Sequence, residues 1–383
     1  MFLKNIVPLP LLFLIFIFNT SIRTCVFPTF SKSGSQHDIK NYRPVSLLSV
    51  VSKILERFVH RELLLKCNEL NILPDSQHGF LPKRSCQSNL LTTYDYLTSH
   101  IDGGVPCDMI FLDFKKAFDS VSHTKLIDKL YVFKLPQTII SWVHSYLFAR
   151  RQRVCLRGSN SSWSYITSGV PQGSVLGPLL FNIFISDLPK CIISQNCSYA
   201  DDLKLFYPSF LSNTIQQDLN RIEAWTSKNG LDLNPDKCVV MHFGHGNPFH
   251  RYFICNKVIP SSTSHSDLGI LVDSSLKFHQ HAEYIIAKVI KKAHYILKTF
   301  LYINANLFST LFKTFLRPVL EYSSRICRPC YPTFINRLET CQRRITKWCR
   351  PLRHLSYHDR LQRLNLTTVK SRLKRGDLIL TYR

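Results

Sequence analysis

Two adjacent carboxylates, Asp201 and Asp202, interrupt a largely apolar stretch at residues 197–206. Apolar residues on both sides of a short polar break predict two strands joined by a tight turn, with both acids at its tip. Ionised carboxylates held side by side repel each other, so a fold that keeps them together usually offsets their charge with divalent cations. The pair therefore indicates a hairpin that presents metal ligands. Taken alone, it also fits ordinary turn chemistry, since aspartates are common in polar turns.

A third carboxylate, Asp113, follows the apolar run at residues 109–112. This run predicts a buried strand, and a charge at the end of such a strand is costly unless it is paired or bound to metal. Two-metal phosphoryl transfer needs acidic ligands from separate strands, which hold two cations about 3.5–4 Å apart. Asp113 therefore completes a candidate metal site. The alternative interpretation is a simple ion pair between Asp113 and Lys115 or Lys116.

A glycine-rich segment lies between the two acidic motifs. Gly169, Pro171 and Gly173 predict a turn where backbone can approach a ligand closely, and Pro178 suits the first turn of a following helix. The apolar face expected for that helix consists of Leu179, Leu180, Ile183 and Phe184. The segment indicates a loop-to-helix junction under a binding cleft. An ordinary buried helix with a glycine-rich entry is the alternative.

Together these motifs resemble those of the reverse transcriptases of non-LTR (LINE-type, jockey-like) retrotransposons. The resemblance extends from Phe27 to the C-terminus, and many motifs in one fixed order make coincidence implausible. It implies an α+β fold of the right-hand polymerase type, with fingers, a ferredoxin-like palm, a helical thumb and basic C-terminal helices. The other motifs that carry it are residues 32–34, 41–48, 77–80, 233–238 and 267–269.

The resemblance implies an RNA-directed DNA polymerase that extends a primer 3′-hydroxyl with dNTPs on an RNA template. Asp113, Asp201 and Asp202 would bind two Mg²⁺ ions, with Mn²⁺ as a possible substitute and no small-molecule cofactor. Lys237 would protonate the leaving pyrophosphate, although a solvated loop lysine is the alternative interpretation. The implied nucleotide-binding residues are Lys32 and Arg43 for the triphosphate, Phe118 beneath the sugar, and Gln172 with Gly173 in the pocket.

The resemblance also divides the chain into three regions. Residues 1–25 would be an apolar remnant helix or pseudo-signal, residues 26–265 the fingers and palm, and residues 266–383 the thumb and basic C-terminal region. The family's strand before Lys32 is expected to be missing, which would truncate the fingers. A catalytically impaired remnant that only binds nucleic acid is therefore the alternative function.

Basic residues greatly outnumber acidic ones, with 49 Lys and Arg against 25 Asp and Glu and a net charge of +24. Residues 325–383 hold 15 of the basic and 3 of the acidic residues, which is half of that charge. Such an excess favours a polyanionic partner, here the template–primer, over a merely solvated basic face. The side chains expected to contact its phosphates are Lys288, Lys291, Lys292, Arg337, Arg343, Arg344 and Lys347.

Helical periodicity supports this placement. Apolar residues recur at spacings of three and four in residues 282–301 and 335–348, and the basic side chains lie between them. A further amphipathic helix is expected at residues 51–70, and it would brace the fingers. Its predicted buried side chains are Ile54, Leu55, Phe58 and Val59.

The thirteen cysteines show no spacing typical of a disulfide framework, so free thiols in a reducing compartment are expected. Cys327, Cys330, Cys341 and Cys349 imitate a zinc site, but zinc is not expected. Residues 6–18 are almost wholly apolar, yet they are shorter than the roughly 20 residues of a spanning helix. The expected location is the nucleus and cytoplasm. Membrane association or secretion through the apolar N-terminus is the alternative, and the oligomeric state is left open.

Overall fold

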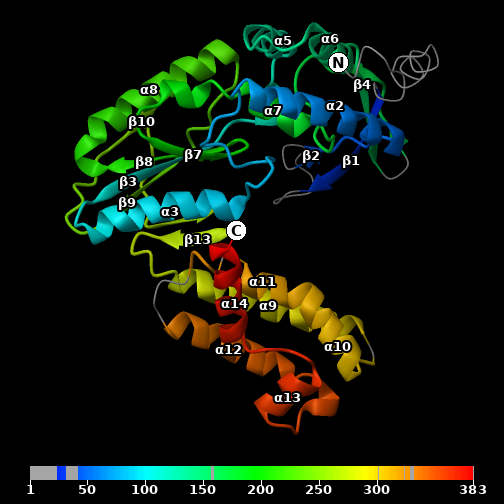
Figure 1. Ribbon diagram of the computed structural model, residues 1–383, viewed down its shortest axis with the longest axis vertical. Coiled ribbons are helices and arrows are strands. Elements are labelled where there is room, and N and C mark those ends of the chain that lie inside the picture. The colour runs from blue at the N-terminus through cyan, green and yellow to red at the C-terminus, as the bar shows by residue number, and fades with distance from the viewer. Residues whose placement is uncertain are drawn as a thin grey trace. The chain divides into compact units, whose positions relative to one another are not determined.

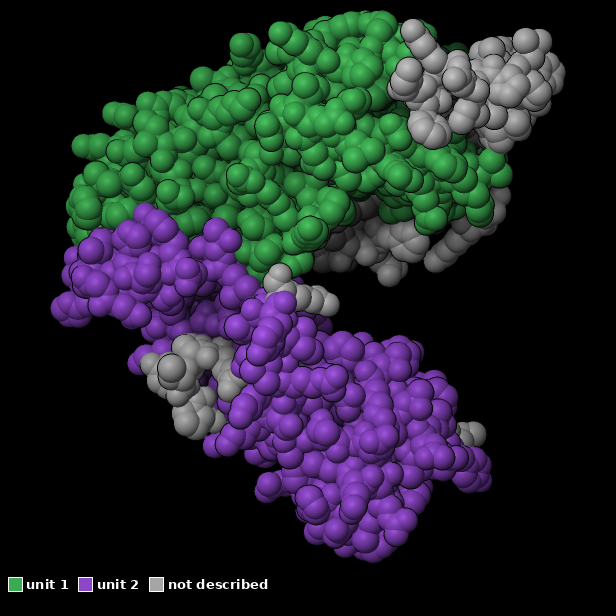
Figure 2. All heavy atoms as spheres, in the orientation of Figure 1, with its two compact units in different colours: residues 1–89, 108–240, 248–260 green, residues 90–107, 241–247, 261–383 purple. Residues whose placement is uncertain are grey.

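The computed structural model describes residues 24–31, 42–156, 159–300, 302–322, 324–327 and 332–382 (Figure 1). The chain divides into two compact units (Figure 2). Unit 1 comprises the described residues within Met1–Asn89, Asp108–Val240 and Pro248–Pro260, and unit 2 those within Leu90–Cys107, Met241–Asn247 and Ser261–Arg383. The predicted division into residues 1–25, 26–265 and 266–383 concerns functional domains, and it stays a prediction.

A four-stranded sheet carries the acidic motifs. Its strands stand in the order β7 (Gln195–Tyr199), β8 (Asp202–Pro208), β3 (Cys107–Leu112) and β9 (Val239–Phe243). Every residue of β3 is buried, and β7 and β8 form an antiparallel hairpin that pairs Tyr199 with Asp202 at its tip. The predicted buried strand before Asp113 and the predicted hairpin are both confirmed.

Most of this sheet belongs to unit 1, and residues 241–243 of β9 belong to unit 2. Unit 1 also contains most of the helices that precede residue 230. These are α2 (Val50–Glu69), α4 (Ala117–Ser120), α5 (His123–Val132), α6 (Gln137–Leu147), α7 (Gly177–Phe184) and α8 (Ser212–Asn229), with short 3₁₀ turns at Leu188–Cys191 and Ser209–Leu211. Helix α7 has a proline in its first turn, and its apolar face is buried in the core of the unit, as predicted. Unit 1 also contains a small β10–β11 hairpin (Phe253–Ile254 and Lys257–Val258).

Helix α2 has the predicted extent but only part of the predicted buried face. Ile54 is 48% exposed and Phe58 67% exposed, whereas Glu56 and Leu63 are fully buried. The Glu56 carboxylate accepts hydrogen bonds from the backbone N–H groups just before α7, which turns its side of the helix toward the core. The expectation was therefore wrong for Ile54 and Phe58, whereas Leu55 and Val59 are partly buried and pack against the core, in line with it.

A second sheet lies at the N-terminal end of the described chain. It has the order β2 (Tyr42–Pro44), β1 (Thr24–Ser31), β4 (Arg151–Leu156) and β5 (Ser159–Asn160), and β6 (Ser164–Tyr165) also pairs with β4. Strand β1 runs parallel to β4 and antiparallel to β2. The expectation that no strand precedes Lys32 was therefore wrong. The predicted N-terminal helix lies outside the described residues, except for Thr24 and Cys25, which belong to β1.

Unit 2 is mostly helical. Helix α3 (Cys86–Asp102) leads into it, and β12 (Ser264–Asp267) and β13 (Ile270–Asp273) form an antiparallel hairpin. The remaining elements are α9 (His279–Thr299), α10 (Ala305–Leu311), a π-helical turn (Phe312–Leu316), α11 (Arg317–Glu321), α12 (Pro332–Thr346), a 3₁₀ turn (Arg350–Leu352), α13 (Tyr357–Arg363) and α14 (Val369–Thr381).

The two units together give a mixed architecture of helices and sheets, which confirms the predicted α+β class. Among the residues that the structure describes, no helix combines the length and the apolar character needed to cross a membrane.

Candidate active site

The tip of the β7–β8 hairpin presents two carboxylates above a buried backbone. Ala200 is buried and has a φ of +56°, while Asp201 is partly exposed and Asp202 is exposed. A left-handed conformation costs a non-glycine residue roughly 1–2 kcal/mol, so neighbouring groups must hold it in place. The turn therefore keeps its backbone fixed and its acids accessible.

Asp113 is the first residue after β3, the strand next to β8 in the sheet. Its Oδ2 atom accepts a hydrogen bond from Asn234 Nδ2 at 3.1 Å and lies 3.6 Å from Lys237 Nζ. The Asn234 backbone N–H also donates to the Asp113 carbonyl oxygen at 2.8 Å, which fixes the two segments together. The side chains of Asp113 and Lys237 are 35% and 61% exposed. The counter-charge thus comes from Lys237, 124 positions further along the chain, in place of the neighbouring lysines considered above.

Aromatic rings link the segments of the two acidic motifs. The Phe80 ring meets Phe118 edge-on at 6.4 Å and lies 6.1 Å from Tyr199, at the end of β7. On its other side, Phe118 stacks on Phe181 of α7, with ring centroids 4.4 Å apart. Contacts of this kind add about 0.5–1.5 kcal/mol each to area burial. They bring the region around Asp113, the hairpin and α7 together around the predicted sugar-contacting residue.

The glycine-rich turn packs against the residues that follow Phe118. Gly169 has a φ of +90°, and a Cβ atom there would come within 2.8 Å of the Asp119 backbone. Its N–H donates to the Val121 carbonyl oxygen at 2.7 Å. The Gln172 side-chain amide donates to Asp119 Oδ1 at 2.9 Å. The turn thus packs its backbone against the residue that follows Phe118, and Gln172 bonds to that residue, Asp119. Close approach of the turn to a ligand stays a prediction.

Gly173 borders Ser46, three residues after Arg43, one of the predicted triphosphate ligands. The Ser46 N–H donates to the Gln172 carbonyl oxygen at 2.8 Å, and a Cβ at Gly173 (φ +94°) would lie 3.0 Å from the Ser46 carbonyl oxygen. Three residues earlier, the Arg43 backbone belongs to β2. The Arg43 side chain and all of Lys32 lie outside the described part of the chain, so their predicted roles stay predictions.

The candidate metal ligands have suitable chemistry, because Mg²⁺ prefers carboxylate oxygens. Asp113, Asp201 and Asp202 supply such oxygens from neighbouring strands. Within the described residues, however, no three His, Cys, Asp or Glu side chains are grouped so that they could hold one metal ion. Asp113 is held by Asn234 and Lys237. The type of donor atom thus suits a divalent cation, whereas the metal-binding role of the three aspartates stays a prediction.

The basic residues of unit 2 lie on the exposed sides of two amphipathic helices. Helix α9 buries Ala282, Ile285, Val289 and Ala293, whereas α12 buries Leu338, Cys341 and Ile345. Their exposed basic side chains, with the one that follows α12, are Lys288, Lys291, Lys292, Arg337, Arg343, Arg344 and Lys347. The predicted separation of apolar and basic faces is confirmed, and contact with nucleic acid stays a prediction.

The contacts made by these basic residues are weak and lie near the surface. Arg337 Nη1 lies 3.1 Å from Glu283 Oε1 of α9, and both side chains are exposed. The Arg343 guanidinium lies over the Tyr357 ring at 4.9 Å. Exposed ion pairs contribute at most about 1 kcal/mol. The positive charge of this surface is therefore largely uncompensated.

The described cysteines include no disulfide, in agreement with the expectation of free thiols. Burial raises the pKa of Cys341 to about 11 and also raises the pKa values of Cys327 and Cys349. Metal ligation requires thiolates, so burial opposes it at these positions. Cys330 lies outside the described residues.

Three residues at the site have roles that the sequence did not reveal. Glu56 binds the turn before α7, Asn234 binds Asp113, and Gln77 contacts the hairpin tip. Gln77 and Asn234 stand in recognised motifs, but nothing in their spacing names the partner. Each partner lies more than a hundred positions away in the chain.

Comparisons with known proteins show what this chain is similar to. A family model described as "Reverse transcriptase (RNA-dependent DNA polymerase)" matches residues 31–292. A probable RNA-directed DNA polymerase from transposon BS of Drosophila melanogaster is 33% identical over 300 residues, which cover 71% of this chain and 33% of that protein. The RNA-directed DNA polymerase from mobile element jockey of Drosophila funebris is 26% identical over 88% of this chain and 40% of its own length. The chain thus spans between a third and two fifths of the length of these curated relatives.

Among solved structures, apo telomerase from Candida tropicalis aligns with a TM-score of 0.48 at 13% identity, covering 89% of this chain and 61% of that one.

Proposed function

Because the chain belongs to the reverse transcriptase (RNA-dependent DNA polymerase) family, we propose that it is the RNA-directed DNA polymerase of a jockey-like non-LTR retrotransposon. It would extend the 3′-hydroxyl of a DNA primer with dNTPs along an RNA template. The observation that carries the proposal is the position of Asp113 at the end of β3, beside the strand β8 that begins with Asp202. This arrangement supplies acidic side chains from neighbouring strands.

Asp113, Asp201 and Asp202 would hold two Mg²⁺ ions, for which Mn²⁺ can substitute. When bound, such ions activate the attacking hydroxyl and neutralise charge on the phosphates. Asp113 Oδ2 lies 3.6 Å from the Lys237 ammonium, so Asp113 would exchange this partner for a cation when it holds one. Lys237 is exposed enough to move, so it can leave Asp113 and donate a proton to pyrophosphate.

The nucleotide would lie over Phe118. The stack of this ring on Phe181 gives it a fixed position, from which a 2′-hydroxyl can be excluded by clash. Gln172 and Gly173 would line the nucleotide pocket from the glycine-rich turn, and the Gln172 side chain is oriented by its hydrogen bond to Asp119. Arg43 and Lys32 would bind the triphosphate, because a guanidinium fork and an ammonium both suit phosphate oxygens.

The template–primer would bind through the basic residues of α9 and α12. Their exposed, weakly paired side chains can contact phosphates and release counterions without rearrangement of the fold. The proposed location is the nucleus and cytoplasm, where RNA templates and DNA targets are found. Cell fractionation tests this location, and recovery in membranes would contradict it.

Primer extension on poly(rA)–oligo(dT) with dTTP and Mg²⁺ tests the proposed activity. We expect extension that stops when EDTA removes the metal and that Mn²⁺ restores. The Asp202→Asn variant serves as the inactive control. A folded wild-type protein that binds template–primer but extends nothing with either metal would be the impaired, nucleic-acid-binding remnant, and the polymerase proposal would be wrong.

A further inference from the structure

One buried side chain contacts the backbone of the hairpin tip on both sides. Gln77 is 1% exposed, and its Oε1 atom accepts a hydrogen bond from the Ala200 N–H at 2.8 Å. Its Nε2 atom donates to the Ala200 carbonyl oxygen at 3.3 Å. One amide therefore satisfies both backbone groups of the residue that precedes Asp201.

These bonds act where the backbone needs support. Ala200 is in the left-handed region, and it is not a glycine. Gly79 lies so close that a Cβ there would be 2.4 Å from the Ala200 nitrogen, and its own N–H donates to Gln77 Oε1 at 2.7 Å. The loop containing Gln77 is thus built around the turn, with no room for a side chain between them.

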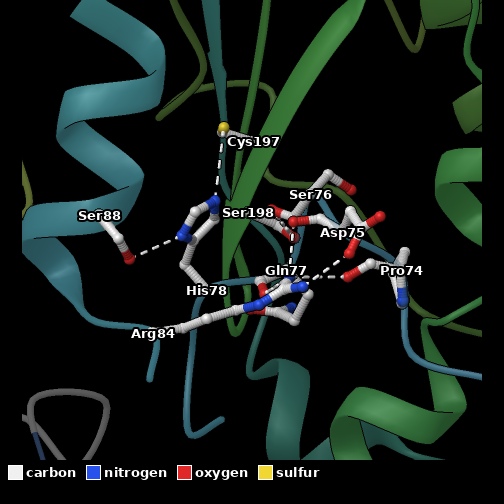
Figure 3. Close-up of polar contacts among 9 residues, drawn as sticks. All are labelled: Pro74, Asp75, Ser76, Gln77, His78, Arg84, Ser88, Cys197 and Ser198. Carbon is white, nitrogen blue, oxygen red and sulfur yellow. Dashed lines mark hydrogen bonds and ion pairs between the residues drawn. The ribbon is translucent and has the colours of Figure 1, made fainter. Parts of the chain in front are cut away.

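The loop is itself anchored firmly, as Figure 3 shows. Arg84 Nη1 donates to the carbonyl oxygens of Pro74, Asp75 and Gln77, and Arg84 Nη2 pairs with the Asp75 carboxylate at 2.7 Å. The backbone on either side of Gln77 also bonds to Ser198 of β7, from Ser198 N–H to the Ser76 carbonyl oxygen and from His78 N–H to the Ser198 carbonyl oxygen, each at 2.8 Å. These bonds fix the position of the Gln77 backbone. The Gln77 side chain therefore restrains the peptide groups of Ala200.

We infer that Gln77 is a positioning residue, which fixes the Ala200 peptide so that Asp201 and Asp202 are directed toward divalent cations. The inference rests on the proposed polymerase function. Gln77 touches neither substrate nor metal in this account. It acts through the backbone, since rotation of the Ala200 peptide would redirect both carboxylates that follow it in the chain.

Gln77→Met removes both hydrogen bonds to Ala200 and the one from the Gly79 N–H, at nearly constant side-chain volume. Mn²⁺ binding is measured by electron paramagnetic resonance in a complex with dideoxy-terminated template–primer and dTTP, so no turnover contributes. We expect Mn²⁺ affinity to fall about tenfold and the Mg²⁺ concentration for half-maximal extension to rise similarly. The maximal extension rate should fall, and template–primer affinity should stay unchanged.

Asn89→Leu provides the matched control. Asn89 is also a buried amide, and its Nδ2 donates to the Ser198 carbonyl oxygen at 3.1 Å, two residues before Ala200 in the same hairpin. The Asn89→Leu variant should lower the melting temperature as much as Gln77→Met but leave Mn²⁺ affinity within twofold of wild type. If Gln77→Met does not fold by circular dichroism, Gln77→Asn gives the same readout, since its amide is one methylene too short to reach Ala200.

The outcomes separate this inference from the proposed function. Unchanged Mn²⁺ affinity in a folded Gln77 variant would overturn the inference, as would an equal loss in the Asn89 control. A wild-type protein that binds Mn²⁺ in the complex but extends no primer would overturn the polymerase proposal alone.

Discussion

The acidic site of unit 1 and the basic surface of unit 2 hold their charged groups in opposite ways. Around the hairpin tip, buried amides and a guanidinium bond to specific backbone atoms, as Gln77 and Arg84 do. On α9 and α12, lysines and arginines extend into solvent with contacts such as the exposed Arg337–Glu283 pair. In unit 1 the positions of the acidic groups are fixed by hydrogen bonds around them. In unit 2 the basic surface consists of many exposed side chains with few specific contacts.

The difference follows from what each surface is proposed to bind. Metal-assisted transfer depends on ligand positions to within about 0.5 Å, so rigid support is needed. A nucleic-acid backbone is a regular polyanion whose attraction depends mainly on how many phosphates are neutralised. We therefore expect single substitutions to have large effects in unit 1 and small effects in unit 2, where several must be combined.

The largest effect is expected at the acidic site. Asp113→Asn or Asp202→Asn keeps the side-chain volume but removes a ligand charge, and it should lower dNTP incorporation by at least about 10³-fold. Template–primer affinity should survive, because it depends on lysines and arginines. Asp236→Asn, an exposed aspartate that pairs with Lys257, is the matched control and should keep its activity. Near wild-type extension by either site variant would contradict the two-metal assignment.

The next effect requires four substitutions in unit 2. Replacing Arg337, Arg343, Arg344 and Lys347 together by Gln should weaken template–primer binding by about 10²-fold at moderate salt, similarly for every sequence. The slope of log affinity against log salt should flatten by about 0.9 per lost B-form phosphate contact. Titrations at several salt concentrations, with circular dichroism on the same samples, measure this. An unchanged slope in a folded variant would mean that the basic face is merely solvated.

Local patterns were enough to predict the parts of the fold that hold these groups. The strand before Asp113, the hairpin at Asp201 and the faces of α9 and α12 all follow from apolar residues close together in sequence. The buried face of α2 could be predicted in this way only for Leu55 and Val59, not for the rest of the helix. It is decided by Glu56, which bonds to Val175 across 119 positions.

The support of the active site was hidden for the same reason. The Gln77–Ala200 contact spans 123 positions and the Asn234–Asp113 contact spans 121. Side-chain amides have no periodicity that distinguishes a backbone clamp from a surface residue. Motif order placed both residues near the site, but only the folded chain gives them partners.

A buried histidine gives unit 1 a dependence on pH. Burial, with the nearby charges of Arg84 and Lys204, lowers the pKa of His78 from 6.5 to about 4. Above pH 6.5 the histidine is neutral in both the folded and the unfolded chain, so its contribution to stability is fully present. As pH falls toward 4, His78 becomes protonated in the unfolded chain but stays largely neutral in the folded chain. The free energy of unfolding therefore falls by up to about 3 kcal/mol.

Urea unfolding of wild type and His78→Asn at pH 7, 5 and 4 measures this loss. The variant should lose less stability between pH 7 and 4 than wild type. His245→Asn, at an exposed histidine of unit 2, should behave as wild type. Parallel pH profiles for wild type and His78→Asn would show that His78 does not supply the dependence.

The sugar-contacting residue should have a moderate effect on selectivity. Phe118→Ala removes the ring that stacks on Phe181, and the open space should admit a 2′-hydroxyl. We expect the preference for dTTP over rUTP to fall about tenfold or more in single-nucleotide insertion, since one group in a pocket is worth roughly 1–3 kcal/mol. Phe133→Ala, another partly buried ring that packs on the same core, is the control for lost packing. An unchanged ratio in an active Phe118 variant would remove this residue from the sugar pocket.

The smallest effect is expected for an Arg→Gln substitution in unit 2, which can be compared with the same substitution in unit 1. Arg337→Gln breaks an exposed ion pair and should lower the free energy of unfolding by less than about 1 kcal/mol. Arg84→Gln removes a guanidinium that donates to three carbonyl oxygens and pairs with Asp75. Hydrogen bonds to charged groups each contribute a net stability of about 1.5–3 kcal/mol, so this variant should be destabilised more than Arg337→Gln. Denaturant unfolding of both variants decides the comparison. If Arg337→Gln destabilised the protein as much as Arg84→Gln, the basic residues of α12 would be holding the fold of unit 2, and their charge would not be free for a polyanion.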